Sequence, residues 1–486
     1  MTASRRGFLG GASASLAAGL VLGPGAATRV RAAETSDVIV LGAGLSGLRA
    51  ASLLAEQGAR VTVLEAGRRV GGRARTVVLD GIPFELGASE VGGDYGRIID
   101  AARRAGATLQ PQVRAAGAMS FHVGGELLRP EQWSAASVNR TVGAEREVLP
   151  HMLETHYALR LNPLKVEAGS WLDPQWSSLD VSAGAWLRSQ GISDAAIELM
   201  SVSTDFTDMW SMSALGMLRD VTRLMLAGFG RQHGGPMYGG AGLPNQFNVI
   251  GGTERLPEAM ARGLGDSVRL GKIVARIVSG PSSVEVECLD GSRFSGDFVV
   301  CTLPFSALRH VSILPALPTA QAESVAACAY GGTTHVILEV KTPFWDSDGF
   351  GPSMYTDGPL ERVFAPKQPD GSIPFLRVWI NGYAADRLDQ LPPAELGAWV
   401  LREFEKMRPS AVGKLAVREV FSWGAEPHIR GHRHVFLPGQ VNRFAREMDR
   451  PWQRIHFAGE HLRRVEVGME GAMETADRAV IEVLSA

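Results

Sequence analysis

Three glycines near the start of the chain have the spacing of a turn that binds nucleotide phosphates. Gly42, Gly44 and Gly47 follow the buried-strand pattern of residues 37–41 and precede a helical pattern. The first glycine permits a tight turn, the second lets the backbone approach a pyrophosphate, and the third lets helix and strand pack closely. The N-terminus of the helix would then face the phosphates. This segment therefore predicts a dinucleotide site.

A second strand pattern, over residues 60–64, completes the unit. It ends in Glu65, 23 residues after Gly42, where a carboxylate can bond ribose hydroxyls. Strand, glycine turn, helix, strand and terminal carboxylate in this order predict a Rossmann-type domain in an α/β fold. The alternative is a purely structural turn between a strand and a helix. The unit alone leaves the choice between NAD and FAD open.

The residues that follow decide between the two cofactors. The segment Glu65 to Arg73, reading EAGRRVGGR, resembles the signature of the FAD-dependent amine oxidase superfamily, which includes monoamine and polyamine oxidases. Its paired glycines allow close approach to the pyrophosphate, and arginine offers fixed donors to phosphate oxygens. A solvated charge cluster is the alternative for the arginines. The likeness continues at Phe84 to Ser89, a segment that passes close to the isoalloxazine ring in that family.

Further motifs of the family follow in the same order, so the resemblance covers nearly the whole chain after residue 32. They are Gly251 to Leu256 with Val274 after it, Phe298 to Pro304, Pro343 to Trp345, Trp423 to Gly439, Ile455 to Glu460, and Met469 to Ala472. The resemblance implies a two-dinucleotide-binding FAD domain made of residues 33–89, 248–305 and 418–486. Residues 90–247 and 306–417 would form a discontinuous α+β substrate-binding domain.

The resemblance also implies a set of residues at a noncovalently held FAD, because the flavin-linked cysteine of some members would fall at Gly431. Glu460 would bond the ribityl chain or the pyrophosphate region. The helix N-terminus near Met469 would face the flavin carbonyl that becomes negative on reduction. The expected cofactor residues are Gly42, Gly44, Leu45, Ser46, Gly47, Glu65, Ala66, Arg68, Gly72, Arg73, Gly87, Ala88, Ser89, Val274, Trp423, Gly459, Glu460, Gly468 and Met469. No metal site is expected.

The sequence departs from the family at its catalytic lysine. Typical members carry this lysine on a strand of the substrate-binding domain, where it holds a water against the reactive flavin nitrogen. Alignment on Pro343 to Trp345 puts His335 at that position. Its titration range suits proton transfer, so His335 is the catalytic candidate. A strand histidine bonded to a backbone carbonyl is the alternative.

The sequence also lacks the two aromatic rings that commonly flank the substrate in this family. Those positions fall at His432 and Gly468, which argues against a simple aryl or alkyl amine. Two carboxylates could bind a cationic substrate, with salt-bridging surface positions as the alternative. The expected substrate-binding residues are Glu90, Tyr238, His432 and Glu466.

The first residues predict an export signal rather than part of the fold. Ser4-Arg5-Arg6 precedes a weakly apolar run from Gly10 to Leu22, typical of a twin-arginine signal over residues 1–32. The protein would use the twin-arginine export machinery and be periplasmic or secreted. No other stretch is apolar for long enough to suggest a membrane span. A net charge of −2 and a pI near 6.6 give no reason to expect a nucleic-acid partner.

Together these features predict an FAD-dependent oxidoreductase. The favoured reaction is oxidation of an amine C–N bond, with hydride transfer to FAD, hydrolysis of the imine, and electrons passed to O2 or a periplasmic redox carrier. A dehydrogenase or desaturase acting on C–C or C–O bonds is the first alternative, favoured by the missing lysine and rings. A flavin-binding partner protein without turnover is the second.

Overall fold

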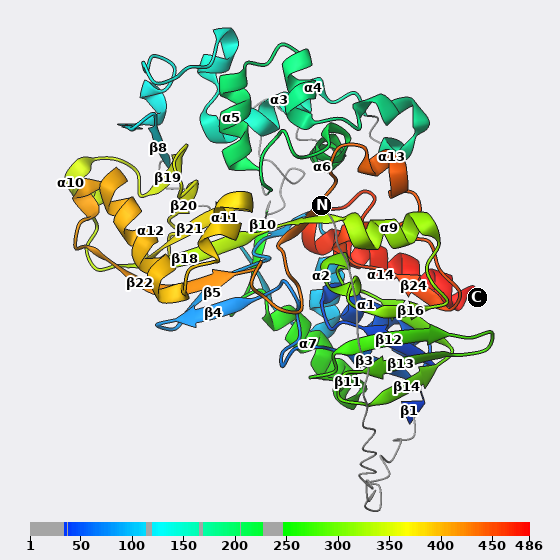
Figure 1. Ribbon diagram of the computed structural model, residues 1–486. Coiled ribbons are helices and arrows are strands. Elements are labelled where there is room, and N and C mark those ends of the chain that lie inside the picture. Colours follow the sequence, from blue (N-terminus) through cyan, green and yellow to red (C-terminus); the bar gives the residue numbers. More distant parts are fainter. Residues whose placement is uncertain (1–33, 36, 113–118, 165–168, 205, 227–245) are drawn as a thin grey trace, which may run out of the picture. The chain divides into compact units, whose positions relative to one another are not determined.

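The computed structural model describes residues 34–35, 37–112, 119–164, 169–204, 206–226 and 246–486 (Figure 1). From Ala33 onward the chain forms one compact unit. The expected signal segment and Tyr238 lie outside the described residues. The boundaries between FAD-binding and substrate-binding segments stay a prediction, because the unit is not divided further.

A parallel sheet carries the glycine turn. Its order is β11 (Val268–Arg269), β3 (Val61–Leu64), β2 (Val38–Leu41), β15 (Phe298–Cys301) and β24 (Ile455–Phe457), and each neighbouring pair is parallel. Every residue of β2, β3 and β24 is buried, as expected of strands covered on both faces. Ile39 and Leu41 join one core cluster, while Val38 and Val40 join another. The strands predicted from these apolar runs are confirmed.

Four helices share the core cluster that contains Val40. They are α1 (Leu45–Glu56), α2 (Gly96–Ala105), α7 (Arg255–Leu264) and α14 (Gly468–Leu484). Small residues such as Ala51 and Ala476 let α1 and α14 pack closely beside the sheet (Figure 1). Arg49 ties three of these helices together, because its guanidinium donates to Asp477 at 2.9 Å and to Asp100 at 3.0 Å.

A second sheet takes most of its strands from the part of the chain between β11 and β15 of the parallel sheet. Its order is β1 (Glu34–Thr35), β14 (Arg293–Gly296), β13 (Val284–Cys288), β12 (Val274–Ser279) and β16 (Ser312–Leu314). Val286 and Phe294 of this sheet join the same core cluster as Ile39 and Leu41. Two core clusters therefore cover the parallel sheet, one for each set of alternating side chains.

A seven-stranded sheet carries the catalytic candidate. Its order is β22 (Leu415–Ser422), β18 (Thr333–Val340), β21 (Phe375–Asn381), β20 (Arg362–Phe364), β19 (Ser353–Thr356), β8 (Met119–Val123) and β9 (Glu126–Leu128). On β18, His335 lies opposite Trp379 of β21 and Phe421 of β22. A histidine in a central strand of this sheet is fixed in place by both neighbours.

Helices and small sheets complete the described unit. Four helices contact one another, namely α3 (Leu153–Leu161), α4 (Ala183–Ser189), α5 (Asp194–Ser203) and α6 (Ala214–Leu226). The remaining α-helices are α8 (Phe305–Leu308), α9 (Thr319–Ala327), α10 (Trp345–Asp348), α11 (Gly382–Leu388), α12 (Pro393–Met407) and α13 (Gln440–Phe444). The small sheets pair β4 (Thr76–Leu79) with β5 (Ile82–Glu85), β10 (Gln246–Val249) with β6 (Val91–Gly92) and β7 (Leu109–Pro111), and β17 (Ala329–Gly331) with β23 (Arg433–Val435).

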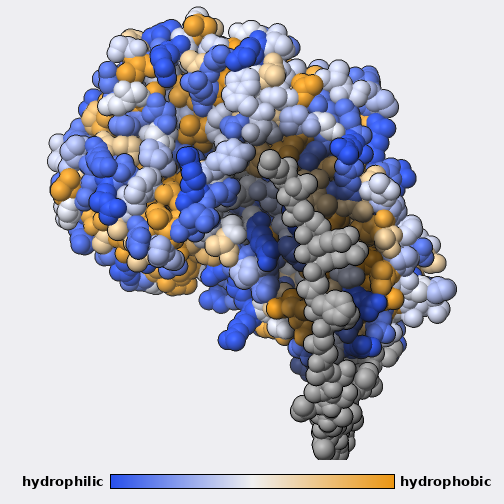
Figure 2. Space-filling model, viewed as in Figure 1, coloured by the Kyte–Doolittle hydropathy of each residue, from blue (hydrophilic) through white to orange (hydrophobic). Residues whose placement is uncertain are grey.

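The surface is mixed in polarity. On the face seen in Figure 2, hydrophilic residues are interspersed with scattered hydrophobic ones. The most exposed large apolar side chains, Leu289, Ile481 and Val412, belong to three different parts of the chain. Among the helices of the described residues, none is both long enough and apolar enough to span a membrane.

Candidate active site

The glycine turn has the geometry that the sequence predicts. Gly42 adopts a φ of +97°, and a Cβ there would lie 2.8 Å from Thr302 Oγ1. A Cβ at Gly47 would lie 1.9 Å from the Gly42 carbonyl oxygen, so the close packing of helix and strand requires glycine. A Cβ at Gly44 would meet no atom within 4 Å. The turn is therefore tightly packed at its first and third glycines and open at its second.

The first turn of α1 offers hydrogen-bond donors. The Leu48 amide donates to the Gly44 carbonyl at 2.9 Å, so the amides before it precede the first intrahelical bond. Ser46 is buried, and its Oγ has no hydrogen-bond partner among the described residues. An orphaned hydroxyl beside the amides of a helix N-terminus fits a phosphate group.

Glu65 is held in a fixed position at the end of β3. Its Oε2 accepts from the Ala43 amide at 2.8 Å, and its Oε1 accepts from the Gly67 amide at 2.8 Å. Each carboxylate oxygen has further lone pairs available. The group is thus oriented before any ligand arrives, as a contact to ribose hydroxyls requires.

The second glycine pair leads to Arg73. Gly71 and Gly72 have φ angles of +106° and +55°, which favour glycine. The Arg73 Nη1 donates to the His432 carbonyl at 2.8 Å and to Glu460 Oε2 at 3.1 Å. Arg73 thus connects the nucleotide turn to the segment before β23 and to the segment after β24.

Glu460 is a buried carboxylate that stays ionised. Its Oε1 lies 2.6 Å from Arg463 Nη1. Burial alone would raise the pKa of Glu460, but Arg463 and Arg73 outweigh it and hold that pKa well below its ordinary value. The following helix, α14, begins at Gly468, where a Cβ would meet no atom within 4 Å. A negative carboxylate and a positive helix end therefore come from one short segment.

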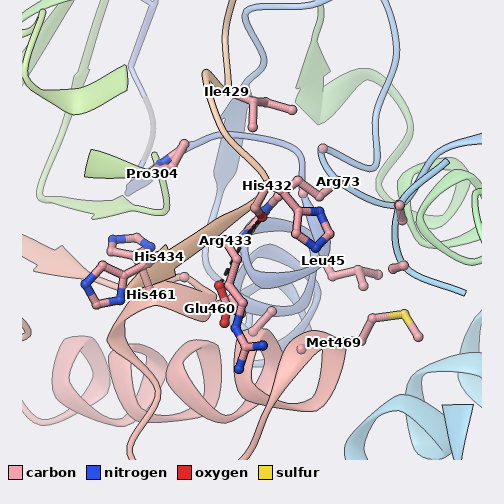
Figure 3. A pocket seen from close by; sticks show the side chains of 18 of the residues that line it. Leu45, Arg73, Pro304, Ile429, His432, Arg433, His434, Glu460, His461 and Met469 are labelled. Atoms are coloured by element: carbon pink, nitrogen blue, oxygen red, sulfur yellow. Dashed lines mark hydrogen bonds and ion pairs between the residues drawn. The ribbon is translucent and has the colours of Figure 1, made fainter. Parts of the chain in front are cut away.

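One cavity of about 1120 Å³ joins these groups (Figure 3). That volume exceeds the range of roughly 300–1,000 Å³ usual for a single small ligand, so a dinucleotide and a small substrate fit together. The opposite wall comes from α3 and α6 and the end of α5, with Glu154, Thr204 and Met217. The expected residues on the wall are Gly42, Gly44, Leu45, Ser46, Glu65, Ala66, Arg68, Gly72, Arg73, Gly87, Ala88, His432, Gly459, Glu460, Gly468 and Met469.

Comparison with known proteins decides the family. The model of the family described as flavin containing amine oxidoreductase matches residues 45–484. The chain belongs to this family. It is 26% identical over 477 residues to an L-amino-acid oxidase of Siganus canaliculatus, covering 92% of this chain and 85% of that protein. It is 25% identical over 470 residues to the flavin-containing amine oxidase B of Homo sapiens, covering 93% and 86%.

Solved structures share the fold. A putrescine oxidase bound to putrescine matches with a TM-score of 0.76 and 23% identity, covering 94% of this chain and all of that one (100%). The cyclohexylamine oxidase of Brevibacterium oxydans matches with a TM-score of 0.75 and 22% identity, covering 93% and 99%. As a member of this amine oxidoreductase family the protein is an FAD-dependent oxidoreductase, which sets aside the alternative without turnover.

The positions of the cysteines agree with a noncovalently bound FAD. Cys288, Cys301 and Cys328 are all buried, and none lies on the cavity wall. Burial raises the pKa of Cys301 and of Cys328 to about 12, so neither thiol is a ready nucleophile. Gly431 adopts a φ of +143°, and a Cβ there would lie 2.6 Å from Tyr330 Cβ. The position expected for a flavin-linked cysteine has no room for a side chain.

Four expected cofactor residues lie off the cavity wall: Gly47, Ser89, Val274 and Trp423. Gly47 packs against the Gly42 carbonyl and so keeps helix α1 close to the glycine turn. Trp423 is fully buried, and its Nε1 donates to the Leu86 carbonyl at 2.7 Å, which fixes the segment before Gly87. Val274 is buried in β12, while the preceding residue, Ile273, is on the wall. These positions could contact the cofactor only through their backbone or their neighbours.

His335 lies behind the cavity wall. It is 1% exposed, its ring packs edge-on against Trp379 at 4.8 Å, and Trp379 packs against His432 of the wall at 5.7 Å. Burial and then Arg377 hold the pKa of His335 well below its ordinary value. Neither ring nitrogen has a hydrogen bond of normal geometry among the described residues, although the Leu86 backbone lies near enough to favour the charged form weakly. His335 is therefore a neutral imidazole one ring away from the cavity.

Of the described residues expected to bind substrate, one lies on the cavity wall and two lie off it. His432 lies on the wall, and its ring is among those drawn in Figure 3. Glu90 is exposed and accepts from Gln246 Nε2 at 2.8 Å. Glu466 lies off the wall in an ion pair with Arg223 at 2.5 Å. Both carboxylates are engaged with protein groups, while their part in substrate binding stays a prediction.

Sequence reasoning missed several polar residues on the wall. They are Arg219 and Asp220 of α6, Arg433 and His434 of β23, and His461. Burial lowers the pKa of His461 to about 3, and burial with Arg219 holds that of His434 well below its ordinary value, so both are neutral. Two signals could have shown them: a charged pair inside the apolar helix pattern of 214–226, and the period-two spacing of His432 and His434.

Proposed function

We propose that this flavoprotein oxidises a C–N bond of a small amine. The observation that carries the proposal is the single cavity, which runs from the glycine turn past the start of α14 to the wall made by α6. A cofactor held by the turn and a substrate held at α6 would meet inside it. When bound, FAD supplies the hydride acceptor for such an oxidation.

The chain's own residues orient the reactants and exclude water. Ser46 and the amides of α1 would hold the phosphates, and Glu65 the ribose. Phe206, Met212 and Met217 are buried apolar side chains on the cavity wall opposite the glycine turn. They exclude water from the part of the cavity that they line. Bound substrate would thus be placed against the cofactor between apolar side chains and the charged side chains of Arg219, Asp220 and Arg433.

His335 would assist proton transfer as a neutral hydrogen-bonding group. Its low pKa means that it stays uncharged and can hydrogen-bond a water or a reacting group, instead of presenting a fixed positive charge. Because Trp379 stands between it and His432, its effect on the substrate would be exerted through a water or through a shift of that ring. We propose it as the proton-handling residue on this basis.

The architecture that goes with this function has two parts. We propose that the parallel sheet and its helices form a Rossmann-type FAD-binding domain from residues 33–89, 248–305 and 418–486. Residues 90–247 and 306–417 would form the α+β substrate-binding domain. The topology supports this division, because β2, β15 and β24 of the one parallel sheet come from all three FAD-binding segments.

Export and the electron acceptor belong to the same proposal. The Arg5-Arg6 pair and the apolar run after it support twin-arginine export to the periplasm or beyond. Reduced flavin would then pass its electrons to O2 or to a periplasmic redox carrier. Comparing the rate of flavin reoxidation by air with that by soluble carriers distinguishes the two acceptors.

A second candidate reaction is oxidation of a C–C or C–O bond. Two observations favour it: His335 stands where the family has its lysine, and Gly468 leaves an open space where an aromatic ring is usual. The relatives, however, are named amine oxidases and L-amino-acid oxidases, and both names denote oxidation of a C–N bond. Amine oxidation is therefore the better supported of the two.

The test is anaerobic absorbance of the purified protein with a panel of primary, secondary and polyamine substrates. Bleaching of the flavin bands by an amine, with release of an aldehyde, ketone or keto acid, supports the proposal. Bleaching by dithionite and by alcohols or C–C donors, with no response to any amine, would replace it with the second candidate.

A further inference from the structure

Trp379 of β21 is fixed from several sides behind the cavity wall. The register of the seven-stranded sheet places it opposite His335 of β18 and opposite Arg362 of β20, so these side chains share one face of the sheet. Its Nε1 donates to Asn381 Oδ1 at 2.7 Å, and its ring packs edge-on against His432 of the wall at 5.7 Å. The hydrogen bond and the neighbouring rings together hold the indole in one orientation.

Two arginines lie against the same indole. The guanidinium carbon of Arg362 is 5.1 Å from the centre of the Trp379 ring, and that of Arg377, also on β21, is 4.9 Å from it. Burial lowers the pKa of Arg377 to about 10, so this guanidinium stays charged at neutral pH. A cation over an aromatic face is attracted by the ring. Two such contacts therefore add to the hold on Trp379.

The two arginines connect the indole to two different parts of the cavity. Arg362 Nη1 donates to the carbonyl of Ser203, which ends α5 on the wall opposite the glycine turn, at 3.1 Å. Arg377 Nη1 donates to the carbonyl of Glu85 at 2.9 Å. Glu85 belongs to residues 84–89, the flavin segment, which is expected near the isoalloxazine ring. One side chain thus ties the end of α5 to the flavin segment.

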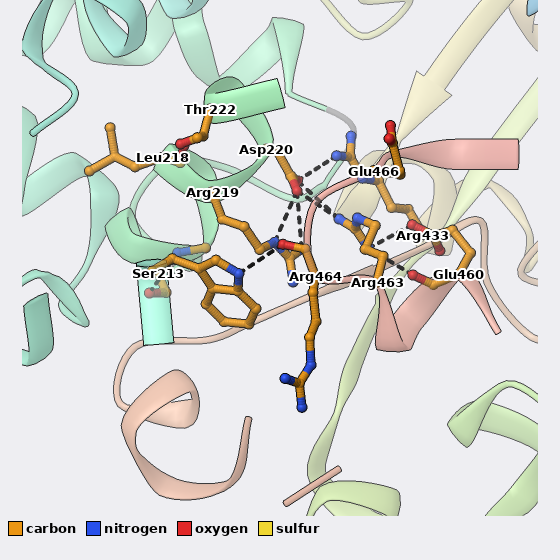
Figure 4. A network of polar contacts seen from close by, with 12 residues as sticks. Ser213, Leu218, Arg219, Asp220, Thr222, Arg433, Glu460, Arg463, Arg464 and Glu466 are labelled. Atoms are coloured by element: carbon orange, nitrogen blue, oxygen red, sulfur yellow. Dashed lines mark hydrogen bonds and ion pairs between the residues drawn. The ribbon is translucent and has the colours of Figure 1, made fainter. Parts of the chain in front are cut away.

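Helix α6, another part of the wall opposite the glycine turn, is held by ion pairs (Figure 4). The Asp220 carboxylate lies 3.1 Å from Arg219, 2.9 Å from Arg463 and 2.5 Å from Arg433. These arginines come from α6, from the segment after β24 and from β23. The Asp220 ion pairs and the Trp379 contacts therefore hold different parts of the cavity in place.

We propose that Trp379 is a positioning residue that sets where a bound substrate lies against the flavin. It acts through its two arginines and through His432, and not by contact with the reacting atoms. A misplacement of about 1 Å between bound reactants can slow a reaction by about 100-fold. The inference rests on the proposed amine oxidation only for the reaction whose rate is measured.

The first experiment removes the indole. Trp379→Leu should lower the limiting rate of anaerobic flavin reduction, per bound flavin, by about 10-fold to 100-fold. Trp379→Phe keeps an aromatic ring at the site and should retain most of the rate. Trp133→Leu is the matched control, because Trp133 is a tryptophan that is 1% exposed and lies off the cavity wall. Equal limiting rates in the two leucine variants would show a purely packing role and overturn the proposal.

The second experiment separates the two arginines and serves as the test should Trp379→Leu fail to fold. Arg362→Gln loses the bond to the end of α5 and should raise the Kd of the substrate about 10-fold, with the flavin spectrum unchanged. Arg377→Gln loses the bond to the flavin segment and should change the visible circular dichroism of the oxidised flavin without any substrate. Arg140→Gln, at an exposed arginine, is the control. The same pattern in both variants, or no change in either, would overturn the proposal.

The third experiment separates this inference from amine oxidation itself. The visible circular dichroism of the flavin is recorded for the oxidised holoenzyme, Trp379→Leu and Trp133→Leu, with no substrate present. A spectrum that changes in Trp379→Leu and not in Trp133→Leu supports the positioning role even if no amine reduces the flavin. Unchanged spectra, together with amine oxidation by Trp379→Leu at the native rate, would overturn the positioning role and leave the proposed function intact.

Discussion

The cavity has a nucleotide end at the glycine turn and a substrate end at α6, and different chemical groups line the two ends. The nucleotide end uses glycines, backbone amides and one carboxylate, all between residues 42 and 73. The substrate end uses side-chain charges that meet from α6, β23 and the segment after β24, with Asp220 and Arg463 lying 243 residues apart. The first can be altered by a single added atom, whereas the second depends on a balance of charges.

The largest effect is expected at Gly47. Gly47→Ala would place a Cβ 1.9 Å from the Gly42 carbonyl, so helix and strand must separate and FAD binding should be lost. The measurement is the ratio of flavin to protein absorbance after purification. Gly263→Ala is the control, because a Cβ at Gly263 in α7 would meet no atom within 4 Å. Full flavin content in Gly47→Ala would contradict the statement that a single added atom alters the nucleotide end.

The next effect concerns His335. His335→Gln should slow anaerobic flavin reduction by about 100-fold, the usual contribution of a positioned proton-transfer group. Because the pKa of His335 lies well below its ordinary value, the slowing should be the same from pH 6 to pH 9. Stopped-flow rates across this range check both statements. A titration near pH 6.5 in the native enzyme that disappears in the variant would contradict the neutral imidazole.

Asp220→Asn tests the charge balance of the substrate end. It leaves three arginines around an uncharged amide, and we expect the free energy of unfolding in urea to fall by about 3 kcal/mol. Asp194→Asn breaks an exposed pair with Arg188 and should change it by less than about 0.5 kcal/mol. Similar losses in the two variants would mean that the network adds nothing beyond a surface ion pair.

The same network predicts a loss of stability in acid. The folded pKa values of Asp220 and Glu460 lie below their ordinary values, so their contribution is fully present above about pH 4 and is lost as the pH falls further. Unfolding midpoints measured from pH 6 to pH 3 should drop more steeply in the native protein than in Asp220→Asn. Parallel curves would exclude Asp220 as a source of the acid sensitivity.

The smallest effect is expected at Glu90. This carboxylate is exposed and bonded to Gln246, off the cavity wall. Glu90→Gln should therefore change the KM for the best amine by no more than about 2-fold, which corresponds to less than about 0.5 kcal/mol. A rise of 10-fold or more in steady-state KM would place Glu90 at the substrate, as the sequence suggested.

The nucleotide end was readable from the sequence because it is local. β2, α1 and β3 lie where the apolar runs and the glycine spacing put them, and Glu65 ends β3 as expected. Apolar runs of four residues fit strands that are buried on both faces, and the glycine turn after the first run sets the order of strand and helix. The family motifs then placed Glu460 and Met469 on the same cavity, although 395 residues separate Glu65 from Glu460.

Sequence patterns could have indicated single residues of the substrate end, but they could not have shown which of its elements meet. Nothing in the spacing of Asp220, Arg433 and Arg463 shows that they meet, since long-range pairing depends on how α6 packs beside β23. His335 was correctly placed on a strand, but its separation from the cavity by Trp379 depends on the neighbouring strand β21. A sequence motif on one strand does not show which side chains the adjacent strands place beside it.

The central claim is that an amine loses hydride to the flavin in this cavity. The most direct measurement is the amount of ammonia or amine released per flavin bleached when the oxidised enzyme is mixed anaerobically with its best amine and then quenched. The account predicts one nitrogen product and one carbonyl product for each flavin reduced. Bleaching that leaves the nitrogen on the carbon skeleton would contradict it and point to oxidation of a C–C or C–O bond.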